Sequence, residues 1–148
     1  MEWTLTERHP ANPDALVALQ LALTAEERRR SRLQATTPDG QTVKLQLPRG
    51  TVLLNGDLLT ADGTTDRVRI VAGPEPVLTV RADNPHNLLK AAYHLGNRHI
   101  ALEVGHDYLR LTPDPVLAHM LEHLGVTVVA ETTPFEPEVG AYQHEHSL

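Results

Sequence analysis

The stretch Gly73-Pro74-Glu75-Pro76 divides this 148-residue chain into two parts with different hydrophobic patterns. Proline lacks a backbone N–H and fixes φ, so two prolines and a glycine within four residues interrupt regular structure. Before this stretch apolar residues recur with the period of two that is typical of strands, and after it strand patterns alternate with helix patterns. We therefore predict two domains, residues 1–74 and 75–136, followed by a flexible histidine-containing tail at residues 137–148.

The first part is predicted to be all-β. Apolar and polar residues alternate in three short runs at residues 3–6, 19–23 and 68–72. Pro38-Asp39-Gly40 lies between two further strand-like runs and predicts a hairpin, and Asn55-Gly56 predicts another tight turn. Residues 24–32 contain four arginines. They are predicted to form a solvated turn with compensating charges, or alternatively a docking surface for an acidic partner.

The second part is predicted to contain two helices between strands. Asn84-Pro85 and Asp114-Pro115 predict the helix starts, because Asn and Asp cap the first turn and proline suits the first helical position. Gly96 is predicted to end the first helix in a left-handed conformation, and Gly125 to end the second. Strands are predicted at residues 78–82, 99–104, 108–111 and 126–130. This β-α-β-β-α-β order is that of a ferredoxin-like unit, so the predicted fold class is α+β, an all-β domain followed by a ferredoxin-like domain.

Composition excludes several classes of function. The formal charge of -6 argues against nucleic-acid binding, which needs Lys and Arg to neutralise phosphates. The absence of cysteine excludes disulfides and thiolate metal sites and suits the cytoplasm. No signal peptide is expected at the N-terminus, and no apolar run approaches the roughly 18–20 residues that span a bilayer. No nucleophile elbow and no glycine-rich phosphate loop is present, so we do not expect an enzyme.

Nine histidines make the chain a candidate metal-binding protein, because imidazole and carboxylate are its available strong ligands. His94 and His99 lie on either side of the predicted helix end, and spacing alone does not separate a solvated role from a metal role. His106 sits in a predicted turn beside Asp107 and is a weaker candidate. A nickel or zinc ion takes four to six ligands, so a twofold dimer that brings together two copies of one histidine is an economical solution.

His119 and His123 are four residues apart on the second predicted helix and share one side of it. The spacing resembles that of the zinc-protease helix. That motif also requires a glutamate directly after the first histidine, where this chain has Met120, so a zinc hydrolase is disfavoured. A solvated helix face and a secondary metal site remain the two alternatives for this pair.

His144-Glu145-His146 places two imidazoles in the predicted tail. Tails are usually frayed and without function, but a flexible pair of imidazoles is suited to catching a metal ion and passing it on. About 10 extended residues beyond Pro137 reach on the order of 33 Å, which is enough to fold back over a site at a dimer axis.

Four stretches carry a specific resemblance to one protein family. They are residues 27–32, residues 47–53 with Gly56-Asp57, the motif Tyr93-His94-Leu95-Gly96-Asn97-Arg98-His99, and residues 134–142. In these stretches the chain resembles the UreE-type urease accessory proteins, the nickel metallochaperones of urease maturation. The resemblance implies a chaperone-like, peptide-binding-like β-domain followed by a ferredoxin-like domain that binds metal and joins two chains in a homodimer.

The resemblance also implies the site and the partners. It points to His99 as the metal ligand shared between two subunits, with His144 and His146 as tail ligands and Ni²⁺ as the ion. Zn²⁺ and Cu²⁺ compete for such imidazole sites. The implied partners are the GTPase of urease maturation and the urease apoprotein complex. Many relatives carry a long histidine-rich tail, so the short tail here favours delivery of one ion over storage. The alternative is a protein-binding assembly module with incidental histidines.

Overall fold

The computed structural model describes residues 2–61 and 63–139, and the chain divides into two compact units, Met1–Gly73 and Pro74–Leu148. The fold is mixed, with several sheets and few helices, as expected from the two hydrophobic patterns. Each unit has its own cluster of buried apolar side chains. The predicted tail histidines, His144 and His146, lie outside the described residues.

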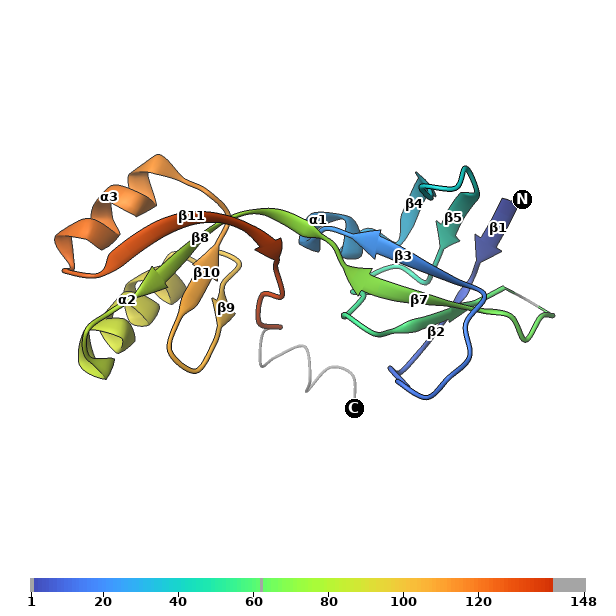
Figure 1. The fold of residues 1–148 in the computed structure, drawn as a ribbon, viewed down its shortest axis with the longest axis horizontal. Coiled ribbons are helices and arrows are strands. Elements are labelled where there is room, and N and C mark those ends of the chain that lie inside the picture. Colours follow the sequence, from blue (N-terminus) through green and yellow to red (C-terminus); the bar gives the residue numbers. More distant parts are fainter. Residues whose placement is uncertain (1, 62, 140–148) are drawn as a thin grey trace. The chain divides into compact units, whose positions relative to one another are not determined.

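The described residues of the first unit, 2–61 and 63–73, form two sheets (Figure 1). Its elements are β1 (Glu2–Leu5), β2 (Glu7–His9), β3 (Leu19–Leu23), α1 (Ala25–Arg28), β4 (Arg32–Thr36), β5 (Thr42–Gln46), β6 (Leu58–Thr60) and β7 (Arg67–Ala72). One sheet has the order β1-β5-β4 and the other the order β2-β6-β7-β3. The predicted hairpin is confirmed, because β4 and β5 pair antiparallel around a turn in which Gly40 has φ 88°.

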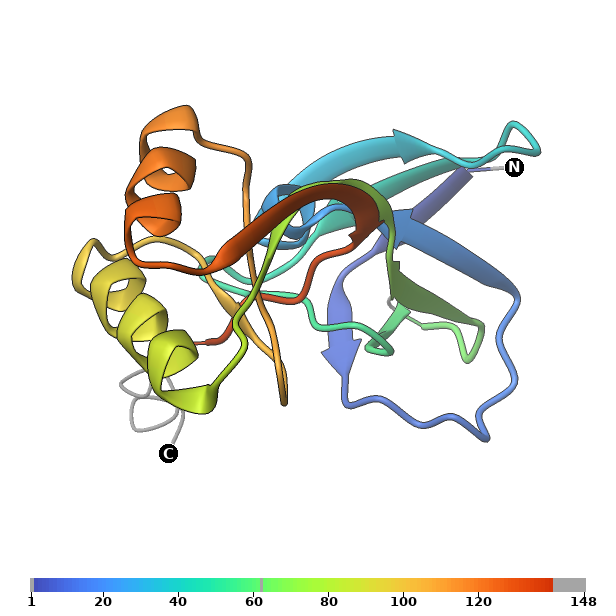
Figure 2. The same cartoon turned by 60° about the vertical axis from the view of Figure 1, so that its left-hand side comes forward.

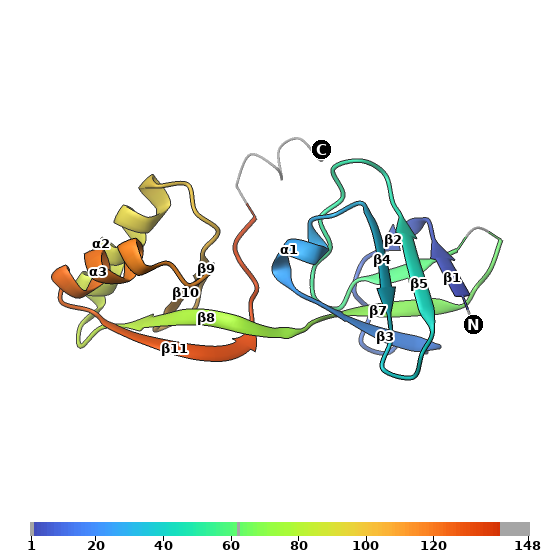
Figure 3. The same cartoon turned by 90° about the horizontal axis from the view of Figure 1, so that it is seen from above.

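The apolar residues of the period-two pattern meet between these two sheets. Leu21 and Leu23 of β3 are buried with Val43 and Leu45 of β5 and with Ile70 of β7. Figure 3 shows β4 and β5 lying across β3 and β7, the arrangement that places one face of each strand in this core. Alternation along the sequence thus translates directly into burial.

The arginine-rich segment is folded more tightly than predicted. Thr24 and Glu27 form a reciprocal capping box that starts the short helix α1. The helix turns Arg28 inward, where only 4% of the residue is exposed and its Nη1 donates to the carbonyl oxygen of Leu23 at 2.9 Å. The prediction of a solvated turn is therefore wrong for Arg28, although Arg30 is exposed.

Over residues 74–139 the second unit forms a four-stranded sheet with two helices. Its elements are β8 (Pro74–Arg81), α2 (Pro85–Asn97), β9 (Glu103–Val104), β10 (Leu109–Leu111), α3 (Pro115–His123) and β11 (Thr127–Pro134). The strand order is β11-β8-β10-β9, and all neighbouring strands are antiparallel. Figures 2 and 3 show α2 and α3 on the same face of this sheet. Leu95 and Leu121 of the helices pack there against Val80, Leu109 and Leu111 of the strands.

Both helix starts are confirmed. The Asn84 side chain accepts a hydrogen bond from the N–H of Asn87, and the Asp114 side chain accepts from Val116 and Leu117. Pro85 and Pro115 follow directly as the first helical residues. These two starts depend on side chains within four residues of one another, which is why the sequence predicts them.

The proline-rich stretch lies at a boundary between two strands, because β7 ends at Ala72 and Pro74 and Pro76 form the start of β8. β8 begins at Pro74, and Pro74 and Pro76 pair with Pro134 and Thr132 of β11. Only residues 78–80 of β8 also pair with β10, so the first half of β8 has a partner on one side alone. Proline is tolerated at such an edge because its missing N–H removes no ladder bond on the open side.

Candidate metal centre

The end of α2 differs from the prediction and determines the position of His99. Gly96 is helical, and the helix continues to Asn97 with Arg98 as its cap. The left-handed residue is His99, with φ 57°, the one non-glycine residue with positive φ in residues 2–61 and 63–139. A side chain in this conformation costs about 1–2 kcal/mol. The turn is closed by hydrogen bonds from the N–H groups of Arg98 and His99 to the carbonyl oxygens of Leu95 and Gly96.

The predicted strand at residues 99–104 forms only at its last two residues, Glu103 and Val104. The left-handed turn at His99 directs the chain away from the helix before strand pairing begins. His99 is therefore exposed on a turn and does not lie on a strand face. His94, also exposed, packs edge-on against the ring of Tyr93 at 5.3 Å between centroids. The two histidines therefore have different surroundings: His99 lies on a turn, and His94 lies on the helix beside the Tyr93 ring.

His106 lies in the turn between β9 and β10, where it and Asp107 are exposed. It lines a groove of about 310 Å³ whose other walls include Leu89 of α2 and Val104 of β9. The turn requires glycine at position 105, because a Cβ there would lie 2.2 Å from the Tyr108 ring. No further histidine lines this groove among the described residues.

His119 and His123 are brought together as the spacing predicts. Their Nε2 atoms are 3.1 Å apart on the exposed side of α3. Leu117 and Leu121 on the opposite side of the helix are buried. Within residues 2–61 and 63–139 no group of three or more His, Asp or Glu side chains is arranged to hold a metal ion.

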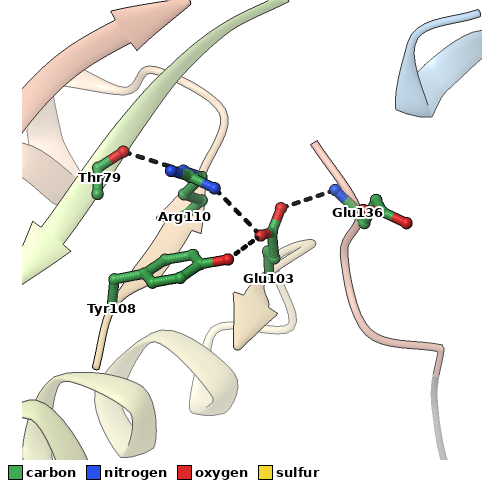
Figure 4. Close-up of polar contacts among 5 residues, drawn as sticks. All are labelled: Thr79, Glu103, Tyr108, Arg110 and Glu136. Atoms are coloured by element: carbon green, nitrogen blue, oxygen red, sulfur yellow. Dashed lines mark hydrogen bonds and ion pairs between the residues drawn. The ribbon is translucent and has the colours of Figure 1, made fainter. Parts of the chain in front are cut away.

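A half-buried polar cluster on β9 and β10 was not predicted (Figure 4). The Glu103 side chain is only 12% exposed. It accepts hydrogen bonds from the Tyr108 hydroxyl at 2.8 Å, from Arg110 Nη1 at 3.3 Å and from the backbone N–H of Glu136 at 2.8 Å. Arg110 Nε also donates to Thr79. A regular strand over residues 99–104 would place the apolar Ile100, Leu102 and Val104 on one inward face and Glu103 on the other, whereas Val104 is 50% exposed.

The cluster has two consequences for the second unit. The bond that Tyr108 donates to Glu103 raises the pKa of the tyrosine above its usual value, and burial adds to this shift. Glu136 and Glu138 donate their N–H groups to Glu103 and to the carbonyl oxygen of Leu102, so the chain beyond β11 is held against the sheet as far as Glu138. The available sequence signal was the pair of opposite charges at Glu103 and Arg110 on either side of the predicted turn, which the β9–β10 hairpin places opposite one another.

Comparison with known proteins places both units in one family. Residues 5–73 match the family described as UreE urease accessory protein, N-terminal domain, and residues 75–148 match the corresponding C-terminal domain. The chain is 54% identical to a urease accessory protein UreE from Nostoc sp., over 97% of each chain. It is 52% identical to the protein of that name from Microcystis aeruginosa, over 97% of this chain and 92% of the relative. No helix in the described part of the chain is both long and apolar enough to span a membrane.

Proposed function

Because this chain belongs to the UreE family of urease accessory proteins, we propose that it is a nickel-binding metallochaperone that delivers Ni²⁺ for assembly of the urease active site. Membership of this family supports a role in urease maturation. The identity of the ion and of its ligands is our proposal. The protein is then a carrier and not an enzyme, and it acts in the cytoplasm. Its partners are the maturation GTPase and the urease apoprotein complex.

The position of His99 is the observation that supports this proposal most. A left-handed turn holds its imidazole at the exposed end of α2, directly after a rigid helix whose Leu95 is fully buried. A histidine kept in a conformation that costs about 1–2 kcal/mol is the kind of local strain that accumulates at functional sites. His99 therefore presents one ligand to an ion that requires several.

We propose that a second copy of the chain supplies the missing ligands. Leu89 and Tyr93 lie one turn apart on α2 and are 69% and 68% exposed. With Gly96 they form one face of the helix that leads to His99. Burial of this face against its counterpart would place two His99 side chains near a twofold axis, with His144 and His146 of the tails completing the site. His106 is a weaker additional ligand on the same unit.

The second unit is accordingly proposed to be the ferredoxin-like metal-binding and dimerisation domain. Its β-α-β-β-α-β order supports this assignment. The first unit, with its two sheets, is proposed to be the chaperone-like domain that contacts protein partners. Zn²⁺ and Cu²⁺ are expected to compete for the imidazoles, since intrinsic affinity places Cu²⁺ above Ni²⁺.

Calorimetric titration of Ni²⁺ into the full chain tests the site. Wild type is expected to bind one tight ion per dimer, with the dimer measured by light scattering. His99→Asn should weaken this binding more than tenfold, because even a group that only orients a metal ligand typically contributes about 10–100-fold. Asparagine is chosen because it tolerates the left-handed conformation, so the turn is retained.

His94→Asn is the matched control, since it removes an exposed imidazole from the same helix end and should leave Ni²⁺ binding unchanged. The double variant His144→Ala/His146→Ala should bind more weakly than wild type but remain dimeric. Unchanged tight binding in His99→Asn, or a tight ion for every monomer, would contradict the proposed site.

A further inference from the structure

Helix α3 carries a second arrangement of imidazoles that the proposed function does not use. His119 and His123 are one turn apart, and both side chains are exposed. The helix beneath them is firmly held, because Asp114 caps its first turn and Leu121 is fully buried. The backbone under both histidines is therefore well ordered, so binding an ion restricts only the two side chains and costs less conformational entropy.

The two nitrogens are close enough for both to bind one ion. The Nε2 atoms are 3.1 Å apart. An imidazole nitrogen binds a divalent ion such as Zn²⁺ at about 2.1 Å. An ion at that distance from both nitrogens makes an N–metal–N angle of about 95°. A tetrahedral angle would need a nitrogen separation of about 3.4 Å. The two separations differ by only about 0.3 Å, so intrinsic affinity decides which ion is favoured, and at imidazole sites it is higher for Cu²⁺ than for Ni²⁺ or Zn²⁺.

The surroundings of the pair also favour a cation. His123 is the last residue of α3, so the ion would lie beside the negative end of the helix dipole. Glu122, exposed between the two histidines in sequence, adds a negative charge to this end of the helix. In the metal-free arrangement one Nε2 must donate its proton to the other, and an ion would take the place of that proton.

We propose that His119 and His123 form a second metal site, a two-histidine chelate for Ni²⁺ or Cu²⁺ that is separate from His99. Among residues 2–61 and 63–139 no third His, Asp or Glu joins the pair, so water fills the remaining positions of the ion. Such a site binds one ion per chain, weakly, and exchanges it readily. It goes beyond the proposed function, because it needs neither a second copy of the chain nor the tail.

The test removes the other proposed ligands first. The full-length triple variant His99→Asn/His144→Ala/His146→Ala serves as the background. Calorimetry measures its affinity and stoichiometry for Cu²⁺, Ni²⁺ and Zn²⁺ in separate titrations. One Cu²⁺ per chain is expected, with Ni²⁺ weaker. Adding His123→Gln should lower the affinity for both ions at least tenfold. Glutamine has good helix propensity, and circular dichroism checks that α3 is retained.

His94→Gln in the same background is the matched control, because it removes one exposed imidazole from α2 and leaves the chelate intact. Electron paramagnetic resonance of the Cu²⁺-loaded background should show two nitrogen ligands, and one or none after His123→Gln. The proposal is overturned if the background binds neither ion, if His94→Gln and His123→Gln weaken binding equally, or if Zn²⁺ binds more tightly than both others. Since the background lacks the ligands of the proposed nickel site, failure at either site leaves the other proposal standing.

Discussion

Replacing Glu103 with alanine is expected to destabilise the second unit by about 3 kcal/mol. The carboxylate accepts three hydrogen bonds, from Tyr108, Arg110 and Glu136. Its removal leaves the Arg110 guanidinium, whose side chain is 16% exposed, without a counter-charge. Breaking a buried ion pair from one side costs about 3–5 kcal/mol. Some water reaches Arg110, and Thr79 still accepts from it, so the lower end of this range applies.

The denaturant-induced unfolding of the two units can be followed separately. The single tryptophan is Trp3 in the first unit, whereas all three tyrosines follow Gly73 in the sequence. Tyrosine absorbance therefore reports the second unit and tryptophan fluorescence the first. Glu103→Ala should move only the tyrosine transition. Glu103→Gln, which keeps an acceptor but removes the charge, should cost less, about 1–2 kcal/mol.

The double variant Glu103→Ala/Arg110→Met distinguishes two causes of the destabilisation, the unpaired Arg110 charge and the loss of packing. If the cost comes from the uncompensated guanidinium, the double variant should be less destabilised than the sum of its single variants. A loss below about 1 kcal/mol for Glu103→Ala, or an additive double variant, would refute the reasoning.

Two further predictions concern α2 and the pH dependence. At concentrations where the chain is monomeric, Gly96→Ala should raise the unfolding free energy of the second unit by up to about 1 kcal/mol, because Gly96 is helical and a Cβ there meets nothing within 4 Å in the single chain. Destabilisation in the tyrosine-detected unfolding would contradict this. The raised pKa of Tyr108 means that the native state holds the phenolic proton more tightly than the unfolded chain does. The resulting contribution to the free energy of unfolding is present below pH 10.0 and is lost as the pH rises through the raised pKa. Spectrophotometric titration should show a lower pKa for Tyr108 in Glu103→Gln, with Tyr108→Phe identifying its signal, and an unchanged pKa would count against the Glu103 bond as its cause.

Features that depend on neighbouring residues could be predicted from the sequence. The caps at Asn84 and Asp114, the hairpin at residues 38–40 and the side of α3 shared by His119 and His123 each involve groups within a few residues of one another. Their geometry follows from backbone preferences and the helical repeat, which act in any fold. The motif that ends at His99 likewise indicated the family, which the comparisons confirm over both units.

Features that depend on distant partners were decided by the tertiary structure. The left-handed residue after α2 is His99 and not Gly96, because the helix continues to Asn97 before the chain turns towards β9. The prolines of β8 are tolerated because β11 covers one side of the strand alone. Glu103 is largely covered because Arg110 and the chain at Glu136 contact it from distant parts of the sequence. Alternation in hydrophobicity distinguishes the two faces of a strand, but it does not say which distant segment packs on each face.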